Sequence, residues 1–146
     1  MENKQELLTL INNRIDKVCD LIKEQNANAM IIFNQANYRY LTNFTGEEAQ
    51  LILTAQGDRI LLSDSRFDSQ IKAEAPGELT VVMKHDSDYN ELTKALKKLD
   101  VKKVLVEGEF VSAIEFQKLQ ALNPNLNFEM SEELVELVRN VKDNLE

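Results

Sequence analysis

Residues 37–46 read NYRYLTNFTG and lie between two apolar runs, 29–33 and 51–53. Both runs are short and continuously apolar, which is typical of buried strands. The segment itself fits neither a clean helix nor a clean strand, because it crowds tyrosine, arginine, phenylalanine and glycine together. Connections between elements are usually short and polar. We therefore predict that this aromatic connection packs against the rest of the fold and serves its function.

An amphipathic helix is predicted before this segment and a β-hairpin after it. The apolar positions of the first helix are spaced by three and four, which places them on one stripe: Leu8, Ile11, Ile15, Val18 and Ile22. Residues 55–58, AQGD, predict a turn in which Gly57 can adopt positive φ. That turn joins predicted strands at 50–53 and 59–62.

Short helices alternate with strands in the rest of the chain. Further strands are predicted at 79–83, 103–106 and 127–130. Together these elements predict an α/β fold, a three-layer sandwich whose mixed sheet of about five to six strands carries helices on both faces.

Helix starts are marked by residues that can cap them. Asp88 precedes one helical pattern, with Glu91 placed as in a capping box, and Ser112 with Glu115 forms an S-x-x-E start. Ser131 is expected to cap the last helix.

Composition narrows the class of protein. The chain has 146 residues, enough for one domain with its own core, and a formal net charge of −8, which disfavours binding to a nucleic-acid backbone. It shows neither a signal-peptide pattern nor a run of eighteen apolar residues, so we expect no membrane partner and a cytoplasmic location. Cys19 lies on the apolar stripe and is expected to be a buried, inert thiol.

Two groups of polar residues are candidate metal sites. The first is the sequence His85-Asp86-x-Asp88, which we interpret as a loop followed by a helix cap. The second is a set of carboxylates that could support metal-dependent phosphoryl transfer if they converged on one point: Glu47, Glu48, Asp64 and Asp68. Capping, turn or exposed roles account for these carboxylates, so no metal is predicted in this chain.

Separated motifs, in a fixed order, resemble one known family. The pattern N-x-x-Y-L-T-x-F-T-G matches residues 37–46, and D-[GS]-R-[YF] matches residues 64–67. The segments VLVEGE at 104–109 and LVRNVK at 137–142 come next along the chain. From about residue 14 to residue 142, the chain resembles the N-terminal domain of the creatinase, prolidase and aminopeptidase P family, and most closely bacterial Xaa-Pro dipeptidases.

The resemblance implies a single, ribonuclease H-like domain over residues 1–146 that is not itself catalytic. Family peptidases act on the bond before proline in a larger C-terminal pita-bread domain, which holds two divalent metal ions (Mn, Co or Zn). Residues 131–146 would lead toward such a domain beyond this sequence. The implied partners are that catalytic domain, a second subunit in a homodimer and a proline-containing peptide, and the implied roles are dimerisation and shaping of the substrate cleft.

Arg66 and Phe67 are candidate cleft or interface residues. A planar, permanently charged guanidinium suits a peptide carboxylate or an acidic group across an interface, and the resemblance places this D-S-R-F turn near the active-site mouth. The alternative for Arg66 is a local ion pair with Asp64 or Asp68.

The aromatic connection supplies three further candidates, Arg39, Tyr40 and Phe44. We expect two of its three aromatic side chains, which include Tyr38, to fill the core beneath it, and Arg39 to be exposed. The resemblance implies that this part of one subunit helps to wall off the catalytic cleft of the other.

Two other functions are possible. A free-standing peptide- or protein-binding module of the same fold would bind its partner without a second domain. A standalone hydrolase would show activity from this chain with added metal.

Overall fold

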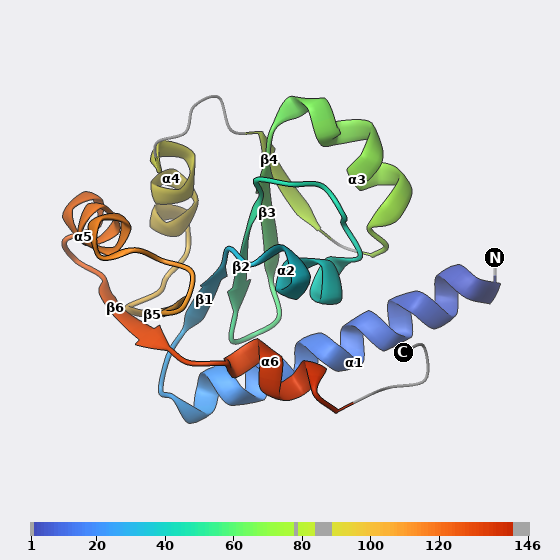
Figure 1. Cartoon of the computed structure of the whole chain (residues 1–146), viewed down its shortest axis with the longest axis horizontal. Helices are drawn as coiled ribbons and strands as arrows, with labels where there is room; N and C mark the ends of the chain where they lie inside the picture. The colour runs from blue at the N-terminus through green and yellow to red at the C-terminus, as the bar shows by residue number, and fades with distance from the viewer. Residues whose placement is uncertain (1, 78, 84–88, 142–146) are drawn as a thin grey trace.

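The computed structural model describes residues 2–77, 79–83 and 89–141. Its strands are β1 (Ala29–Ile32), β2 (Gln50–Thr54), β3 (Arg59–Ser63), β4 (Thr80–Met83), β5 (Lys103–Glu107) and β6 (Asn127–Ser131). Its helices are α1 (Glu2–Glu24), α2 (Gln35–Thr42), the 3-10 helix η1 (Ser65–Phe67), α3 (Asp68–Glu74), α4 (Asn90–Lys98), α5 (Ala113–Leu122) and α6 (Leu134–Arg139). Figure 1 shows how these elements are arranged.

The strands form one mixed six-stranded sheet in the order β4-β3-β2-β1-β5-β6. Strands β1, β2 and β3 form an antiparallel meander, whereas β4, β5 and β6 pair in parallel with β3, β1 and β5, respectively. The turn between β2 and β3 contains Gly57 at φ +99°, as the predicted hairpin requires. The predicted α/β class and the mixed sheet are both confirmed.

Helices cover both faces of the sheet. Along β1, Met30 and Ile32 pack in the cluster shared with α1, α2 and α6, while Ala29 and Ile31 pack in the cluster shared with α4 and α5. A strand that is buried on both faces has no polar side to present to water. This explains why the two runs that flank residues 37–46 are continuously apolar.

The predicted apolar stripe of the first helix faces the sheet. Ile11, Ile15, Val18 and Ile22 are at most 1% exposed. Cys19 on the same side is also buried, and burial raises its pKa to about 11, so this thiol stays protonated and poorly nucleophilic at neutral pH. No helix among the described residues is long and apolar enough to cross a membrane.

The prediction of a connection at residues 37–46 was wrong in its first half, because residues 35–42 form helix α2. Asn34 begins the helix by accepting a hydrogen bond from Ala36 N at 3.0 Å. Asn43 ends it in the left-handed conformation, at φ 68°, with its N–H bonded to Arg39 O. Asparagine suits both positions because its side chain can cap a helix start and its backbone tolerates positive φ. These two asparagines were the overlooked signals.

Two predicted caps have other outcomes. Ser131 does not cap the last helix: it ends β6, where it pairs with Glu107 and donates to Val106 O, and Glu133 precedes α6 without a side-chain cap. Ser131 is engaged in strand pairing three residues before α6 begins at Leu134, so it cannot cap that helix. Asp88, with His85 and Asp86, lies outside the described residues. Ser112 and Glu115 do form the predicted capping box.

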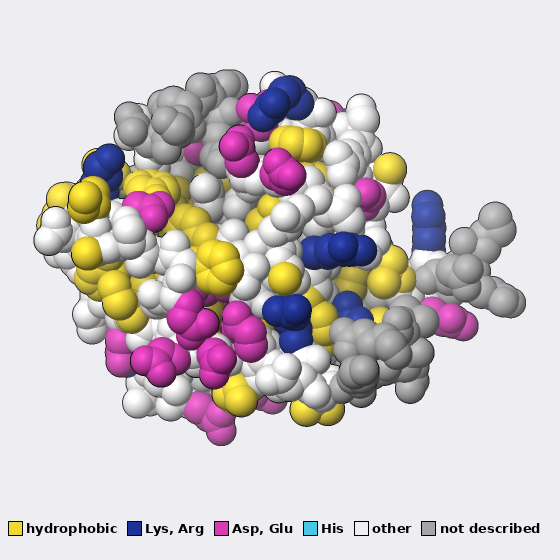
Figure 2. Space-filling model, viewed as in Figure 1, with side chains coloured by type: hydrophobic (Ala, Val, Ile, Leu, Met, Phe, Trp, Pro, Cys, Tyr) yellow, Lys and Arg dark blue, Asp and Glu magenta, His cyan; other side chains and the backbone are white. Residues whose placement is uncertain are grey.

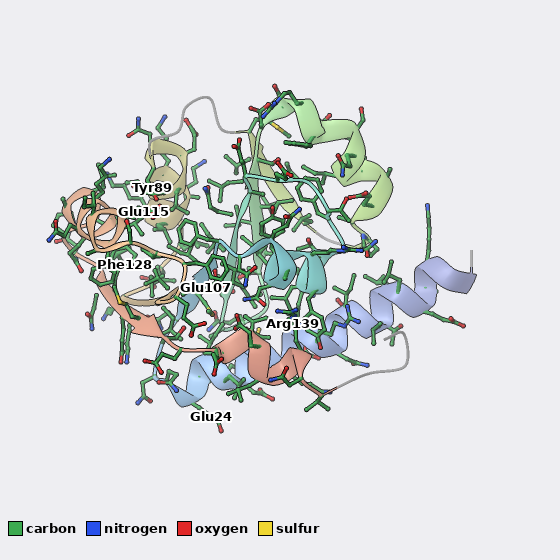
Figure 3. All side chains as sticks on the ribbon, viewed as in Figure 1. Glu24, Tyr89, Glu107, Glu115, Phe128 and Arg139 are labelled. Carbon is green, nitrogen blue, oxygen red and sulfur yellow. The ribbon has the colours of Figure 1, made fainter. Side chains whose placement is uncertain are left out.

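The starts of α4 and α5 are joined by one polar contact. The Tyr89 hydroxyl donates to the Glu115 carboxylate at 2.5 Å, and the two side chains lie together in Figure 3. This hydrogen bond lowers the pKa of Glu115. A carboxyl with a lowered pKa stabilises the fold above its unfolded pKa, and this contribution is lost as the pH falls through the folded pKa.

We expect Tyr89→Phe to lower the free energy of unfolding at pH 7 by about 1 kcal/mol, because the hydrogen bond is lost while the ring is kept. The difference from wild type should shrink as the pH falls below about 4. Urea denaturation at several pH values measures this. In a Glu115→Gln background the pH dependence of the difference should disappear; a difference independent of pH in both backgrounds would show that only ring packing matters.

Candidate functional site

The aromatic residues of the 37–46 motif form a buried group that includes Phe44 of the 43–49 loop, a loop in which only Glu47 and Glu48 are exposed. Phe44 is fully buried, stacks on Tyr38 and meets Phe67 edge to face, with ring centroids 6.2 and 5.8 Å apart. The Tyr38 hydroxyl donates to Gly46 O. A Cβ at Gly46 would overlap the Phe44 ring, so only glycine fits there. This packing fixes the 43–49 loop on the fold.

Tyr40 ties α2 to two other helices. It is 8% exposed, and the Arg14 guanidinium of α1 lies over its ring, 4.1 Å from the centroid. Arg14 Nη1 also donates to Tyr40 O at 2.9 Å, while the Tyr40 hydroxyl reaches Val138 O in α6 at 3.4 Å. All three aromatic residues of the motif are therefore buried, one more than predicted, so Tyr40 and Phe44 are core residues.

A buried carboxylate lies at the end of β5. Glu107 is only 5% exposed, yet both of its oxygens are occupied. Its Oε1 accepts from the N–H groups of Phe33 and Asn34 at 2.6 and 2.8 Å, and its Oε2 accepts from Asn37 Nδ2 at 2.6 Å. The carboxylate thus joins β5 to the end of β1 and the start of α2.

Asn37 extends this network to the C-terminal helix. Arg139 Nη1 donates to Asn37 Oδ1 at 3.0 Å, and Asn37 Nδ2 also lies 3.1 Å from Glu136 Oε2. Figure 3 shows Glu107 and Arg139 on either side of the start of α2. We call Asn37, Glu107, Glu136 and Arg139 the motif network. Asn37, Glu107 and Arg139 belong to the motif segments 37–46, 104–109 and 137–142, and Glu136 directly precedes the last of these. Figure 2 shows acidic side chains gathered near α6 and the end of β6.

Opposing effects set the protonation of Glu107. Burial raises its pKa, hydrogen bonds from Asn37, Asn34 and Phe33 lower it, and the nearby Glu136 carboxylate raises it again; the net change is upward. A raised pKa means that Glu107 contributes most to stability below its unfolded pKa, and that this contribution is lost as the pH rises through the folded pKa. The hydrogen bonds are what keep the charged form tolerable in the interior.

Sequence reasoning singled out neither Asn37 nor Glu107 as functional. A glutamate at the end of an apolar strand, VLVEGE, was the available signal for a buried, partnered charge. The partners of this glutamate could not be read from the sequence because they are distant along the chain. Asn37 is 70 positions from Glu107, and Arg139 is 102 positions from Asn37.

Arg66 is exposed and ion-paired locally. Its side chain is 67% exposed and its Nε lies 3.2 Å from Asp64 Oδ1, with Glu48 3.8 Å from its Nη2. Asp64 also caps η1 by accepting from Arg66 N, while Asp68 pairs with Lys72 instead. Exposed pairs of this kind are worth little, so Arg66 can exchange Asp64 for another carboxylate at low cost.

Arg39 is also exposed and lies in the last turn of α2, just before the 43–49 loop, whereas Arg66 lies beside Glu48 near the end of that loop. Glu74 of α3 holds this loop at Thr45: Thr45 N and Thr45 Oγ1 donate to its carboxylate at 2.8 and 3.0 Å, and Gln70 Nε2 donates to it at 3.2 Å. Burial raises the pKa of Glu74, but these hydrogen bonds and the positive charge of Arg39 lower it on balance. Arg39 and Arg66 therefore flank the 43–49 loop, which α3 holds through Glu74.

Three of the four carboxylates considered as a metal site have other partners. Asp64 caps η1, Asp68 pairs with Lys72, and Glu48 lies near Arg66. Within residues 2–77, 79–83 and 89–141, no group of three His, Cys, Asp or Glu side chains is placed to hold a metal ion.

Comparison with known proteins identifies the family. The model of the creatinase/prolidase N-terminal domain matches residues 14–141. The chain belongs to this family. The match includes all four residues of the motif network, so the hydrogen bonds among Asn37, Glu107 and Arg139 lie inside a creatinase/prolidase N-terminal domain. None of the curated proteins compared with the chain matches it.

Solved structures of the same fold include isolated domains and longer enzymes. The N-terminal domain of the cytoplasmic peptidase PepQ from Mycobacterium tuberculosis is 27% identical, with a TM-score of 0.80, over 88% of this chain and 99% of that chain. The Xaa-Pro dipeptidase from Bacillus anthracis is 20% identical, with a TM-score of 0.84, over 92% of this chain and 37% of that chain. The X-Pro aminopeptidase from Thermotoga maritima is 27% identical, with a TM-score of 0.71, over 81% and 34%.

We expect Asn37→Ala to lower the free energy of unfolding by about 2 kcal/mol near neutral pH, because it leaves Glu107 Oε2 buried without its donor. Loss of that donor also raises the pKa of Glu107 further, so the deficit should grow as the pH rises from about 4 to about 7. Urea denaturation at several pH values measures both effects.

Asn13→Ala, an exposed position on α1, is the matched control and should change stability by less than about 0.5 kcal/mol. If Asn37→Ala were equally mild at neutral pH, the motif network would not stabilise the fold.

Proposed function

We propose that this chain is the non-catalytic N-terminal domain of a proline-specific metallopeptidase, an Xaa-Pro dipeptidase or aminopeptidase. The observation that carries this proposal is the share of each known structure that the chain covers. The chain corresponds to almost all of the PepQ N-terminal domain but spans only 37% of the dipeptidase and 34% of the aminopeptidase. The proposed domain therefore comprises residues 1–146, with residues 131–146 leading to a catalytic domain.

In this proposal the chemistry belongs to the catalytic domain. That domain would hold two divalent ions (Mn, Co or Zn), which activate water and stabilise the oxyanion formed during peptide hydrolysis. Two observations support this assignment of the chemistry to the other domain. The chain belongs to the creatinase/prolidase N-terminal family, and Asp64, Asp68 and Glu48 are already engaged in a helix cap or ion pairs. We infer that the whole enzyme is cytoplasmic, in keeping with the similar domain that comes from a cytoplasmic peptidase.

The small domain would shape the substrate cleft and take part in a homodimer. Arg39 and Arg66 are the proposed contacts, because both are exposed and both flank the 43–49 loop. Their guanidinium groups suit the carboxylate of a proline-containing peptide or acidic groups on the facing domain. Tyr40, Phe44 and Phe67 would contribute indirectly, since their packing holds the backbone that carries the two arginines.

The motif network would give the domain a defined connection to the catalytic domain. Arg139 and Glu136 lie in α6 and are bonded to Asn37 at the start of α2. Because two side chains of α6 are bonded to Asn37, the direction of this helix is fixed relative to α2. Helix α6 would therefore orient the catalytic domain relative to the arginine-flanked loop.

The first test is to read the gene beyond codon 146 and to express the encoded protein. We expect a further domain with Asp, Glu and His metal ligands, and hydrolysis of an Xaa-Pro dipeptide by the longer protein with Mn²⁺. The 146-residue chain alone should be inactive under the same conditions. A stop codon after residue 146, or activity from the chain alone, would contradict the proposal.

In the full-length enzyme we expect Arg66→Ala to lower kcat/KM for an Xaa-Pro dipeptide about tenfold, the effect of losing one charge-assisted hydrogen bond. Thermal stability should stay almost unchanged because Arg66 is exposed. Lys72→Ala removes a nearby exposed cation from α3 and is the matched control, with kcat/KM within about twofold of wild type as the expectation. Loss of folding in Arg66→Ala would instead show that Arg66 is structural.

A further inference from the structure

Strand β4 is an edge strand whose sequence lacks the usual protection. Within the part of the chain that the structure describes, it pairs only with β3. Its residues, Thr80–Met83, read TVVM and carry no charge. Proteins commonly protect such edges with lysine, proline or a bulge, because unpaired N–H and C=O groups can pair with another strand. By contrast, the opposite edge strand, β6, carries the charged Glu129.

A groove runs beside this edge on the sheet face that α4 covers. Its volume is about 420 Å³, and α4 forms one wall. Ile60 of β3, Val82 of β4 and Ala95 of α4 supply its apolar surface. Ile60 and Val82 are only half-buried, although both belong to the cluster packed against α4. Within the described ranges, helix α4 therefore leaves the outer part of this face uncovered.

The rim of the groove is basic in a chain of net charge −8. Lys94, Lys97 and Lys98 line it on α4, together with one acidic residue, Glu91. Glu91 pairs with Lys94 at 3.4 Å. Lys97 and Lys98 are exposed, and the structure shows no ion pair between either of them and a described residue. Two positive charges thus stand beside an apolar floor and an open strand edge.

We propose that β4 and α4 form a docking site for an extended, acidic segment of a partner protein, which adds as a strand to the free edge of β4. Strand addition supplies the backbone hydrogen bonds, and alternate side chains of the segment enter the groove over Ile60 and Val82. Acidic side chains on the same segment meet Lys97 and Lys98. This site is separate from the arginine-flanked loop and does not depend on the proposed peptidase function.

Charge distinguishes this occupant from a second copy of the chain. Antiparallel pairing of two β4 edges about a two-fold axis would place both α4 helices on the same face of the joined sheet. The lysine rims of the two copies would then flank one continuous surface, and like charges would repel. An acidic strand from another protein satisfies the edge and the rim together.

The test uses the 146-residue chain and a fluorescein-labelled heptapeptide, Asp-Val-Glu-Val-Glu-Val-Asp, as the probe. Anisotropy titration at low salt should show saturable binding that weakens as salt is added. A peptide with lysine in place of each acidic residue should bind at least about tenfold more weakly, since both rim charges then repel it. In ¹⁵N-labelled protein, the acidic peptide should shift the amide signals of Thr80–Met83 and of α4.

Charge-reversal variants distinguish a local effect of the rim lysines on peptide affinity from an effect of the net charge of the chain. We expect the double variant Lys97→Glu/Lys98→Glu to weaken binding about tenfold, because two attractive contacts become repulsive. Lys17→Glu/Lys118→Glu makes the same change in net charge at exposed positions on α1 and α5 and should leave the affinity within about twofold. Circular dichroism establishes that both variants are folded.

Several outcomes would overturn the proposal. These are equal weakening by the two double variants, equal binding of the lysine peptide, or amide shifts confined to elements other than β4 and α4. Self-association of the free chain in analytical ultracentrifugation, with concentration-dependent shifts of the β4 signals, would assign the edge to a second copy instead. Each result is independent of whether the longer protein hydrolyses Xaa-Pro dipeptides.

Discussion

The Glu107 carboxylate is the interaction on which the arrangement of this domain most depends. An ionised group in a protein interior is costly unless hydrogen bonds replace its water, and here three donors from the end of β1 and the start of α2 do so. Asn37 in turn accepts a hydrogen bond from Arg139 of α6, which links this helix to Glu107. Three segments distant in sequence are thereby required to meet at one point, so the position of the C-terminal helix is tied to the centre of the sheet.

This constraint also separates the exposed surfaces. The aromatic residues of the 37–46 motif are turned inward and hold the 43–49 loop, while the arginines beside it, Arg39 and Arg66, remain outside. The β4 edge, which no other described strand pairs with, lies at the far end of the sheet from β6 and carries no motif of the family resemblance. The domain accordingly presents two chemically different surfaces: one flanked by guanidinium groups, the other an apolar groove with a lysine rim.

Much of the fold was predictable because its signals are local. The stripe from Ile11 to Ile22 follows from helical spacing, the hairpin from Gly57, and the start of α5 from Ser112 and Glu115. Helix α2 escaped prediction because its aromatic residues dominated the pattern, whereas its boundaries depend on Asn34 and Asn43. Ser131 was misassigned because serine suits both a cap and a strand end, and pairing with Glu107 decided between them.

The sequence by itself determined the α/β class and, through the order of its motifs, the family. Those properties rest on periodicity and on short segments whose meaning survives without their neighbours. Only the tertiary structure decided that Asn37, Glu107 and Arg139 form one network, that Tyr40 and Phe44 are core residues, and that β4 is the edge strand of the described sheet. Such facts depend on which distant segments are packed together, and burial and hydrogen bonding across that packing have no counterpart in local sequence.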